Sequence, residues 1–104
     1  MSDRIAVCKA DDMYAGEIRP ATLPDGRVIA LYNVDGAIYA TDDLCTHGEA
    51  SLSDEGTLTG KIVECPWHSG TFDVTTGAAL TLPCQVALKT YQVEQIDGTV
   101  YVHC

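Results

Sequence analysis

Four residues whose side chains bind transition metals stand in two close pairs. The first pair is Cys45 and His47, with one residue between them. The second pair is Cys65 and His68, within "CPWHSGTFD", with two residues between them, and residues 48–64 separate the pairs. Thiolate sulfur and imidazole nitrogen are ligands that suit zinc and iron–sulfur centres. The spacing therefore predicts one metal centre held by two segments, each of which supplies one cysteine and one histidine.

A structural zinc site is one interpretation, because two cysteines and two histidines form a common zinc ligand set. Zinc fingers, however, usually place the two cysteines together and the two histidines together, whereas each segment here supplies one of each. The single-residue gap between Cys45 and His47 is also tighter than the usual zinc spacing. The pattern favours an iron–sulfur cluster, and a structural zinc domain remains an alternative.

Most of the chain outside these pairs has the pattern of short β-strands separated by turns. Runs rich in Val, Ile, Tyr and Thr flank the dipeptides Asp35-Gly36 and Asp97-Gly98. Asp-Gly between such runs is typical of a type I′ hairpin, in which both central residues need a positive φ. Asp25-Gly26 and Thr76-Gly77 mark two further turns. The pattern predicts an all-β fold, a sandwich or small barrel.

The two metal-binding pairs interrupt this strand pattern. Residues 42–57 and 65–71 are polar or contain glycine, so each pair is expected on a loop. The run "LTGKIVEC", residues 58–65, is predicted to be a strand that delivers Cys65 to its loop. A chain of 104 residues is long enough for one core and too short for two. We therefore expect a single domain over 1–104, with the cluster-binding subdomain at about 42–72.

Composition and charge limit the classes of function. The net charge is −9 with six Lys and Arg residues, which argues against binding nucleic acid. The acidity has two interpretations that stay open, namely solubility and the steering of a basic partner. Because five cysteines cannot all form intramolecular pairs, a closed disulfide framework is excluded. The chain has no membrane-length apolar run and no targeting segment at its start, so a cytoplasmic monomer that binds no membrane is expected.

The pattern Cys-x-His, 17 residues, Cys-x-x-His resembles that of the Rieske proteins. The similarity extends to "CPWHSGTFD", the turn at Gly77, Leu82-Pro83 and the closing "TYQVEQIDGTVYV". In its length and single domain the chain is similar to the Rieske ferredoxins of bacterial aromatic-ring-hydroxylating dioxygenase systems. The resemblance implies an antiparallel β sandwich with a small cluster-binding subdomain made of two loops.

The resemblance also implies a ligand set and a role. By position, Cys45 and Cys65 ligate the buried iron of one [2Fe–2S] cluster, and His47 and His68 ligate the outer iron. The protein is then no enzyme but a carrier that takes single electrons from an NAD(P)H-dependent flavoprotein reductase to a terminal oxygenase. A Rieske-like small subunit of a nitrite-reductase-type complex is a further alternative. Such subunits generally lack the ligands, and all four are present here.

Four positions differ from the high-potential branch of that family. Ala50 and Trp67 stand where that branch has two cysteines that form a disulfide, so this bridge cannot form here. Gly70 and Phe72 stand where it has a Ser and a Tyr whose hydroxyls donate hydrogen bonds to sulfur. Because such bonds favour the reduced cluster, their absence predicts a potential near the low end of the Rieske range, roughly −150 mV.

Other residues near the loops are expected to support or surround the cluster site. Five acidic residues around the first loop are expected to form either a partner-facing surface or an ordinary solvated loop: Asp42, Asp43, Glu49, Asp54 and Glu55. Phe72 is expected to pack beneath the cluster subdomain, and Pro83 to lie over the cluster. The remaining cysteines have no predicted ligand role: Cys8, Cys84 and Cys104.

Overall fold

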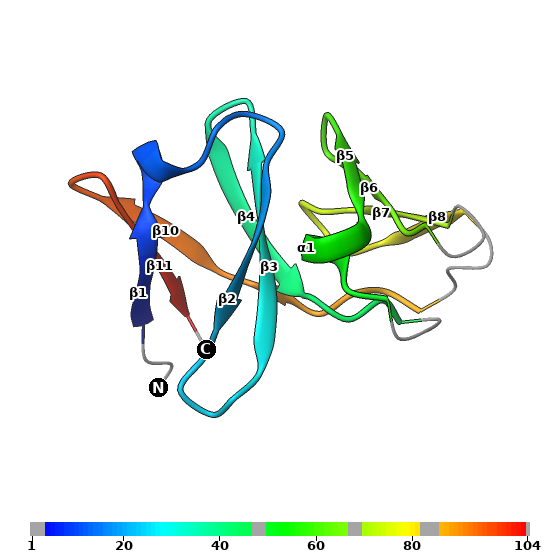
Figure 1. Cartoon of the computed structure of the whole chain (residues 1–104), viewed down its shortest axis with the longest axis horizontal. Helices are drawn as coiled ribbons and strands as arrows, with labels where there is room; N and C mark the ends of the chain where they lie inside the picture. Colours follow the sequence, from blue (N-terminus) through cyan, green and yellow to red (C-terminus); the bar gives the residue numbers. More distant parts are fainter. Residues whose placement is uncertain (1–3, 47–49, 67–69, 82–85, 104) are drawn as a thin grey trace.

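The computed structural model describes residues 4–46, 50–66, 70–81 and 86–103. In this part of the chain the strands form three antiparallel sheets (Figure 1). The first sheet has the order β1 (Arg4–Lys9), β11 (Thr99–His103), β10 (Val93–Ile96). The second sheet has the order β2 (Ile18–Thr22), β3 (Val28–Val34), β4 (Ala37–Asp42), β9 (Thr90–Tyr91). The third sheet has the order β5 (Thr57–Thr59), β6 (Ile62–Glu64), β7 (Thr71–Asp73), β8 (Ala79–Thr81). The prediction of an all-β antiparallel fold is confirmed.

The predicted Asp-Gly hairpins are present with the expected backbone. Asp35 and Gly36 have φ values of 51° and 95°, and they connect β3 to β4. Asp97 and Gly98 have φ values of 50° and 80°, and they connect β10 to β11. Aspartate tolerates the left-handed region better than most residues, and glycine adopts it freely. These local turns therefore set the register of two strand pairs in the sandwich.

Strand β3 lies between two separate cores. Ala30 and Tyr32 belong to a buried cluster shared with the third sheet, whereas Ile29 and Leu31 belong to a second cluster shared with β10 and β11. Successive side chains of a strand point to opposite faces, so one strand can supply both cores. Five consecutive residues of β3 are buried for this reason.

The third sheet and a short helix lie together at one end of the molecule, on the right of Figure 1. The prediction of one strand over residues 58–65 is wrong in detail. Residues 57–59 and 62–64 are two paired strands, β5 and β6, and Gly60 turns between them with a φ of 59°. Cys65 still follows directly after β6, as expected.

Helices are short in the described residues. They are the 3-10 turn η1 (Ala10–Asp12) and the single turn α1 (Leu52–Glu55). Ser51 caps α1, because its side chain accepts a hydrogen bond from the backbone N–H of Asp54. In the part of the chain that the structure describes, no helix is long and apolar enough to cross a membrane.

Candidate metal centre

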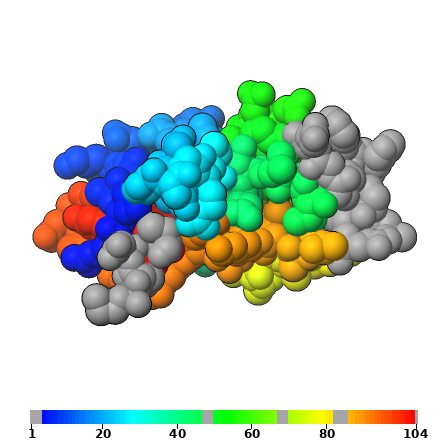
Figure 2. All heavy atoms as spheres, turned by 90° about the horizontal axis from the view of Figure 1, so that it is seen from below, coloured from blue at the N-terminus to red at the C-terminus, as the bar shows by residue number. Residues whose placement is uncertain are grey.

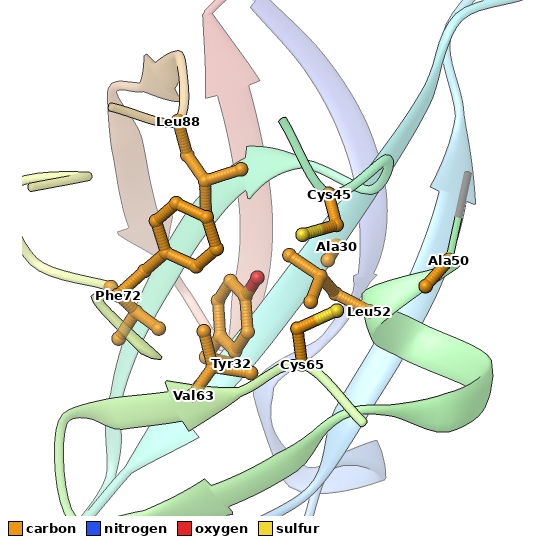
Figure 3. Packing of buried hydrophobic residues seen from close by; sticks show 10 residues of the cluster. Ala30, Tyr32, Cys45, Ala50, Leu52, Val63, Cys65, Phe72 and Leu88 are labelled. Carbon is orange, nitrogen blue, oxygen red and sulfur yellow. The ribbon is translucent and has the colours of Figure 1, made fainter. Parts of the chain in front are cut away.

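The two predicted cysteine ligands lie in the same buried cluster. Cys45 and Cys65 are 2% and 0% exposed, and both pack in the core between β3 and the third sheet. Figure 3 shows both side chains on one side of Tyr32, near Leu52, with Phe72 on the other side. The fold therefore brings together two thiols that are 20 residues apart in the sequence.

The two cysteine loops are closed in the same way. The first loop, residues 45–50, is bounded by an isolated bridge between Leu44 and Ser51. The second, residues 65–70, is bounded by the pairing of Glu64 with Thr71 in β6 and β7. In each loop the cysteine N–H donates to the carbonyl of its last residue, at 3.0 Å from Cys45 to Ala50 and 2.8 Å from Cys65 to Gly70. Each loop thus starts with a cysteine held at its base by a backbone hydrogen bond.

A third segment, residues 86–90, lies against the first loop. The Thr46 hydroxyl donates to the Val86 carbonyl at 2.6 Å. Figure 2 shows this segment, in orange, along the face of the molecule beside the green residues of the first loop. The predicted turn at Gly77 holds the same segment from the other side, because the Leu88 N–H donates to the Gly77 carbonyl at 2.8 Å. The described part of the site is therefore built from three segments.

The acidic residues of the first loop do not form one surface. Asp54 and Glu55 are exposed, but Asp43 is only 8% exposed and its carboxylate accepts hydrogen bonds within the loop. The interpretation of Asp43 as part of a solvated or partner-facing surface is therefore wrong. Its structural role could have been suspected from the capping pattern of Ser51 and Asp54, which predicts a helix start beside it.

Several residues that the sequence analysis singled out, inside and outside the predicted site, lie outside the described residues. They are His47, Glu49, Trp67, His68, Pro83, Cys84 and Cys104. Ala50 and Phe72 are described, and both are buried in the cluster that contains the two cysteines. Phe72 was predicted to pack beneath the cluster subdomain, and its side chain is fully buried in this cluster, on the far side of Tyr32 from the two cysteines (Figure 3).

Cys8 lies in a different environment from the two loop cysteines. It is half-buried in β1 and packs against the second core, with Val100 and Val102. Burial raises the pKa of the Cys8 thiol, because the thiolate is poorly solvated there. The structure thus separates Cys8 from the pair that it brings together.

Tyr91 forms a polar network beside the base of the first loop. Its hydroxyl donates to Asp42 Oδ1 at 2.5 Å and accepts from Arg27 Nη1 at 3.1 Å. Burial, together with the hydrogen bond to Asp42, raises the pKa of Tyr91 to about 12. Since this folded value is above the ordinary tyrosine pKa of about 10, the neutral hydroxyl stabilises the fold below about pH 10. That contribution is lost as the pH rises from about 10 through 12.

Replacing Tyr91 with phenylalanine is expected to lower the free energy of unfolding at pH 7 by about 1 kcal/mol, because one hydroxyl and its hydrogen bonds are lost. The decline in stability between about pH 10 and 12 should also become shallower. Urea unfolding followed by circular dichroism at pH 7 and pH 11 measures both effects. Tyr14→Phe is the control, since Tyr14 is 72% exposed, and it should change neither value. An equally steep alkaline decline in Tyr91→Phe would contradict the pKa assignment.

The chemistry of the described site fits a cluster held by thiolates. Iron–sulfur clusters are held in proteins by cysteine thiolates, with histidines in place of two cysteines in the Rieske type. Cys45 and Cys65 supply two sulfur ligands from separate loops in an apolar, water-poor environment, and that environment influences the potential of a bound cluster. The described part of the site thus fits a buried cluster with two cysteine ligands.

Comparisons with known proteins also indicate a protein that binds an iron–sulfur cluster. The model of the Rieske [2Fe-2S] domain family matches residues 3–92. The ferredoxin component of the p-cumate 2,3-dioxygenase system of Pseudomonas putida is 45% identical over 98% of this chain and 86% of that protein. Ferredoxin CarAc of Metapseudomonas resinovorans is 48% identical over 94% of this chain and 91% of its own length.

A solved structure supports the same assignment. A chain in a complex of reduced oxygenase and oxidised ferredoxin in carbazole 1,9a-dioxygenase superposes with a TM-score of 0.91. It is 47% identical and covers 96% of this chain and 92% of its own length. This chain belongs to the Rieske [2Fe–2S] domain family, and it is an electron carrier with one [2Fe–2S] cluster rather than an enzyme.

Proposed function

We propose that this chain is the ferredoxin component of an aromatic-ring-hydroxylating dioxygenase system. In that role it takes single electrons from an NAD(P)H-dependent flavoprotein reductase and passes them to a terminal oxygenase. The main support is its 47% identity, over nearly its full length, with a chain from a complex of oxygenase and ferredoxin. Relatives named as ferredoxin components of p-cumate and naphthalene dioxygenase systems add to it.

The proposal assigns four ligands. Cys45 and Cys65 would hold one iron, and His47 and His68 would hold the other. The matched closure of the two loops supports this set, because it presents one cysteine at the base of each loop, with a histidine following in each. When bound, the cluster supplies reversible uptake of one electron. The assignment places the cluster subdomain at about 42–72 within one domain of residues 1–104.

The described residues contribute a dry and preformed setting for the cysteines. Tyr32, Leu52, Val63 and Phe72 are fully buried around them, which limits the access of water to the thiolate side of the site. The backbone bonds of the two cysteine N–H groups hold the loop bases before any partner binds. A site that needs little rearrangement suits an electron carrier, because reorganisation slows electron transfer.

The surface beside the loops suits brief contacts with partner proteins. Leu44 and Val86 are 55% and 64% exposed, and both adjoin residues that we assign to the site. The net charge of −9 would favour encounter with a basic partner surface. We include in the proposal that the carrier acts as a monomer in the cytoplasm, where NAD(P)H is available to the reductase.

Metal analysis and spectroscopy test the ligand assignment. Anaerobically purified protein is expected to hold two irons and two acid-labile sulfides per chain. After dithionite reduction it should give the rhombic EPR signal of low average g value that histidine-ligated clusters show. The midpoint potential should be roughly −150 mV, because Gly70 and Phe72 offer no side-chain hydroxyl to sulfur. Zinc in place of iron, or a potential near that of plant-type ferredoxins at about −400 mV, would contradict the assignment.

Electron transfer to an oxygenase tests the proposed role itself. The reduced protein should be reoxidised rapidly by the oxygenase of carbazole 1,9a-dioxygenase, whose own ferredoxin is the chain compared above. Stopped-flow absorbance of the cluster follows this step. Increasing ionic strength should slow it if charged surfaces steer the encounter. A cluster with the expected signal but no transfer to several such oxygenases would place this carrier in another redox system.

A further inference from the structure

We propose that Asp43 is a positioning residue for the first cluster loop, and that its buried charge lowers the reduction potential. The inference rests on the proposed function in one respect, the assignment of Cys45 as a ligand. Asp43 stands two residues before Cys45, at the point where the chain leaves β4. Asp43 forms several hydrogen bonds, it is nearly buried, and among the described residues no Lys or Arg forms an ion pair with it.

The Asp43 carboxylate joins the two ends of the first loop. Oδ1 accepts a hydrogen bond from the backbone N–H of Ser53 at 2.7 Å, and Oδ2 accepts one from the Ser51 hydroxyl at 2.6 Å. The Asp43 carbonyl accepts from the Leu52 N–H at 2.8 Å. Three bonds from one residue thus hold the start of α1 against the residue that leads into the loop. Bonds to a charged acceptor are stronger than neutral ones.

These contacts act on Cys45 through the backbone between them. The next pair along the loop is the bridge of Leu44 with Ser51, followed by the hydrogen bond from Cys45 N–H to the Ala50 carbonyl. Asp43 therefore precedes two successive backbone contacts, and the second of them is the hydrogen bond of the Cys45 N–H. Loss of the carboxylate would weaken this hydrogen bond without changing the cysteine side chain.

The hydrogen bonds of Asp43 come from neutral groups, whereas Asp42 is linked through Tyr91 to the cation of Arg27. The Tyr91 hydroxyl donates a hydrogen bond to Asp42 Oδ1 and accepts one from Arg27. Asp43 is nearly buried, at 8% exposure, and within the described residues it forms no ion pair with Lys or Arg. A negative charge in a poorly solvated place acts strongly on nearby charges. It would therefore oppose the addition of an electron to a cluster ligated by Cys45, two residues along the chain.

Three variants separate the charge of Asp43 from its contacts. Asp43→Asn keeps the shape and removes the charge. Ser51→Ala keeps the charge and removes one contact of the carboxylate, together with the side-chain cap of α1. Asp54→Asn is the matched control, because it makes the same change of charge at an exposed position in α1. For each purified holoprotein, the midpoint potential is measured by spectroelectrochemistry, and cluster loss is followed by visible absorbance with an iron chelator present.

Asp43→Asn should shift the potential to a more positive value and lose its cluster roughly tenfold faster, since charged hydrogen bonds become neutral ones. Ser51→Ala should lose its cluster several-fold faster, with a smaller shift of potential. Asp54→Asn should match the wild type in both measurements. If Asp43→Asn yields too little holoprotein, Ser51→Ala still tests the contact by its rate of cluster loss.

Two results would overturn the inference. One is an Asp43→Asn potential that equals that of Asp54→Asn, which would leave Asp43 with a structural role alone. The other is a rate of cluster loss in Ser51→Ala that equals the wild-type rate. Failure of the wild-type protein to bind a [2Fe–2S] cluster is a different outcome, because it would contradict the proposed ligands rather than the role of Asp43.

Discussion

Replacing Cys45 or Cys65 with alanine is expected to abolish cluster binding, with iron and sulfide falling from two per chain to near zero. Each substitution removes one of the two proposed thiolate ligands, and the buried cluster as described contains no third cysteine that could replace it. Because the binding energy of a structural metal centre is also folding energy, the melting temperature should fall steeply. Metal analysis, visible absorbance and thermal unfolding measure these three effects.

Cys8→Ala is the matched control for the cysteine variants. Cys8 is half-buried and packs against the second core, which does not contain the two loop cysteines. The variant should keep the full cluster content, the EPR signal and the potential, with at most a small loss of stability. A Cys45→Ala protein that still held two irons, or a Cys8→Ala protein that held none, would refute the ligand assignment.

Gly77→Ala is expected to destabilise the fold more than alanine does at a turn glycine with open space around it. Gly77 has a φ of 80°, where a side chain is strained by about 1–2 kcal/mol. An added Cβ would also lie 2.2 Å from the Leu88 carbonyl oxygen and 2.9 Å from Cγ2 of Thr90. Relieving this overlap requires a backbone shift that costs about 1–3 kcal/mol more. Since the same segment bonds Thr46 through Val86, cluster retention should weaken too.

Gly98→Ala separates strain from overlap. Gly98 has the same φ of 80°, but nothing lies within 4 Å of an added Cβ. This variant should therefore lose only about 1–2 kcal/mol of unfolding free energy, the cost of the left-handed backbone. Urea unfolding of both proteins, followed by circular dichroism, gives the comparison. Equal losses of unfolding free energy in the two variants would show that the overlap with Leu88 does not destabilise the fold.

Local features of the fold were predictable from the sequence because their causes are local. Asp35-Gly36 and Asp97-Gly98 form hairpin turns with positive φ at both residues, as two-residue type I′ turns require. The short runs rich in Val, Ile, Tyr and Thr between turns likewise predicted an all-β fold, and the family resemblance implied that it is antiparallel. A hairpin was missed at Gly60, where "TGK" carries a weaker turn signal than Asp-Gly.

The kind of site was predictable from spacing alone. One cysteine and one histidine in each of two loops favoured an iron–sulfur cluster over zinc, and the family comparison agrees. Ligand type and spacing are encoded in the chain because ligands must reach one centre from neighbouring positions. The partner proteins could be predicted only from the family resemblance, because the surface of a partner is not encoded in this chain.

The setting of the site depended on tertiary structure. Asp43 resembles the other acidic residues of its loop in sequence, yet the fold turns it inward onto Ser51 and Ser53. Gly77 resembles a simple turn glycine, yet it contacts Leu88 closely enough to exclude a side chain. These roles arise from segments that meet only after folding, so no local pattern encodes them. The sequence by itself determined the strands, the turns and the ligand types, whereas packing decided which polar groups are buried and how the two cysteine loops are held together.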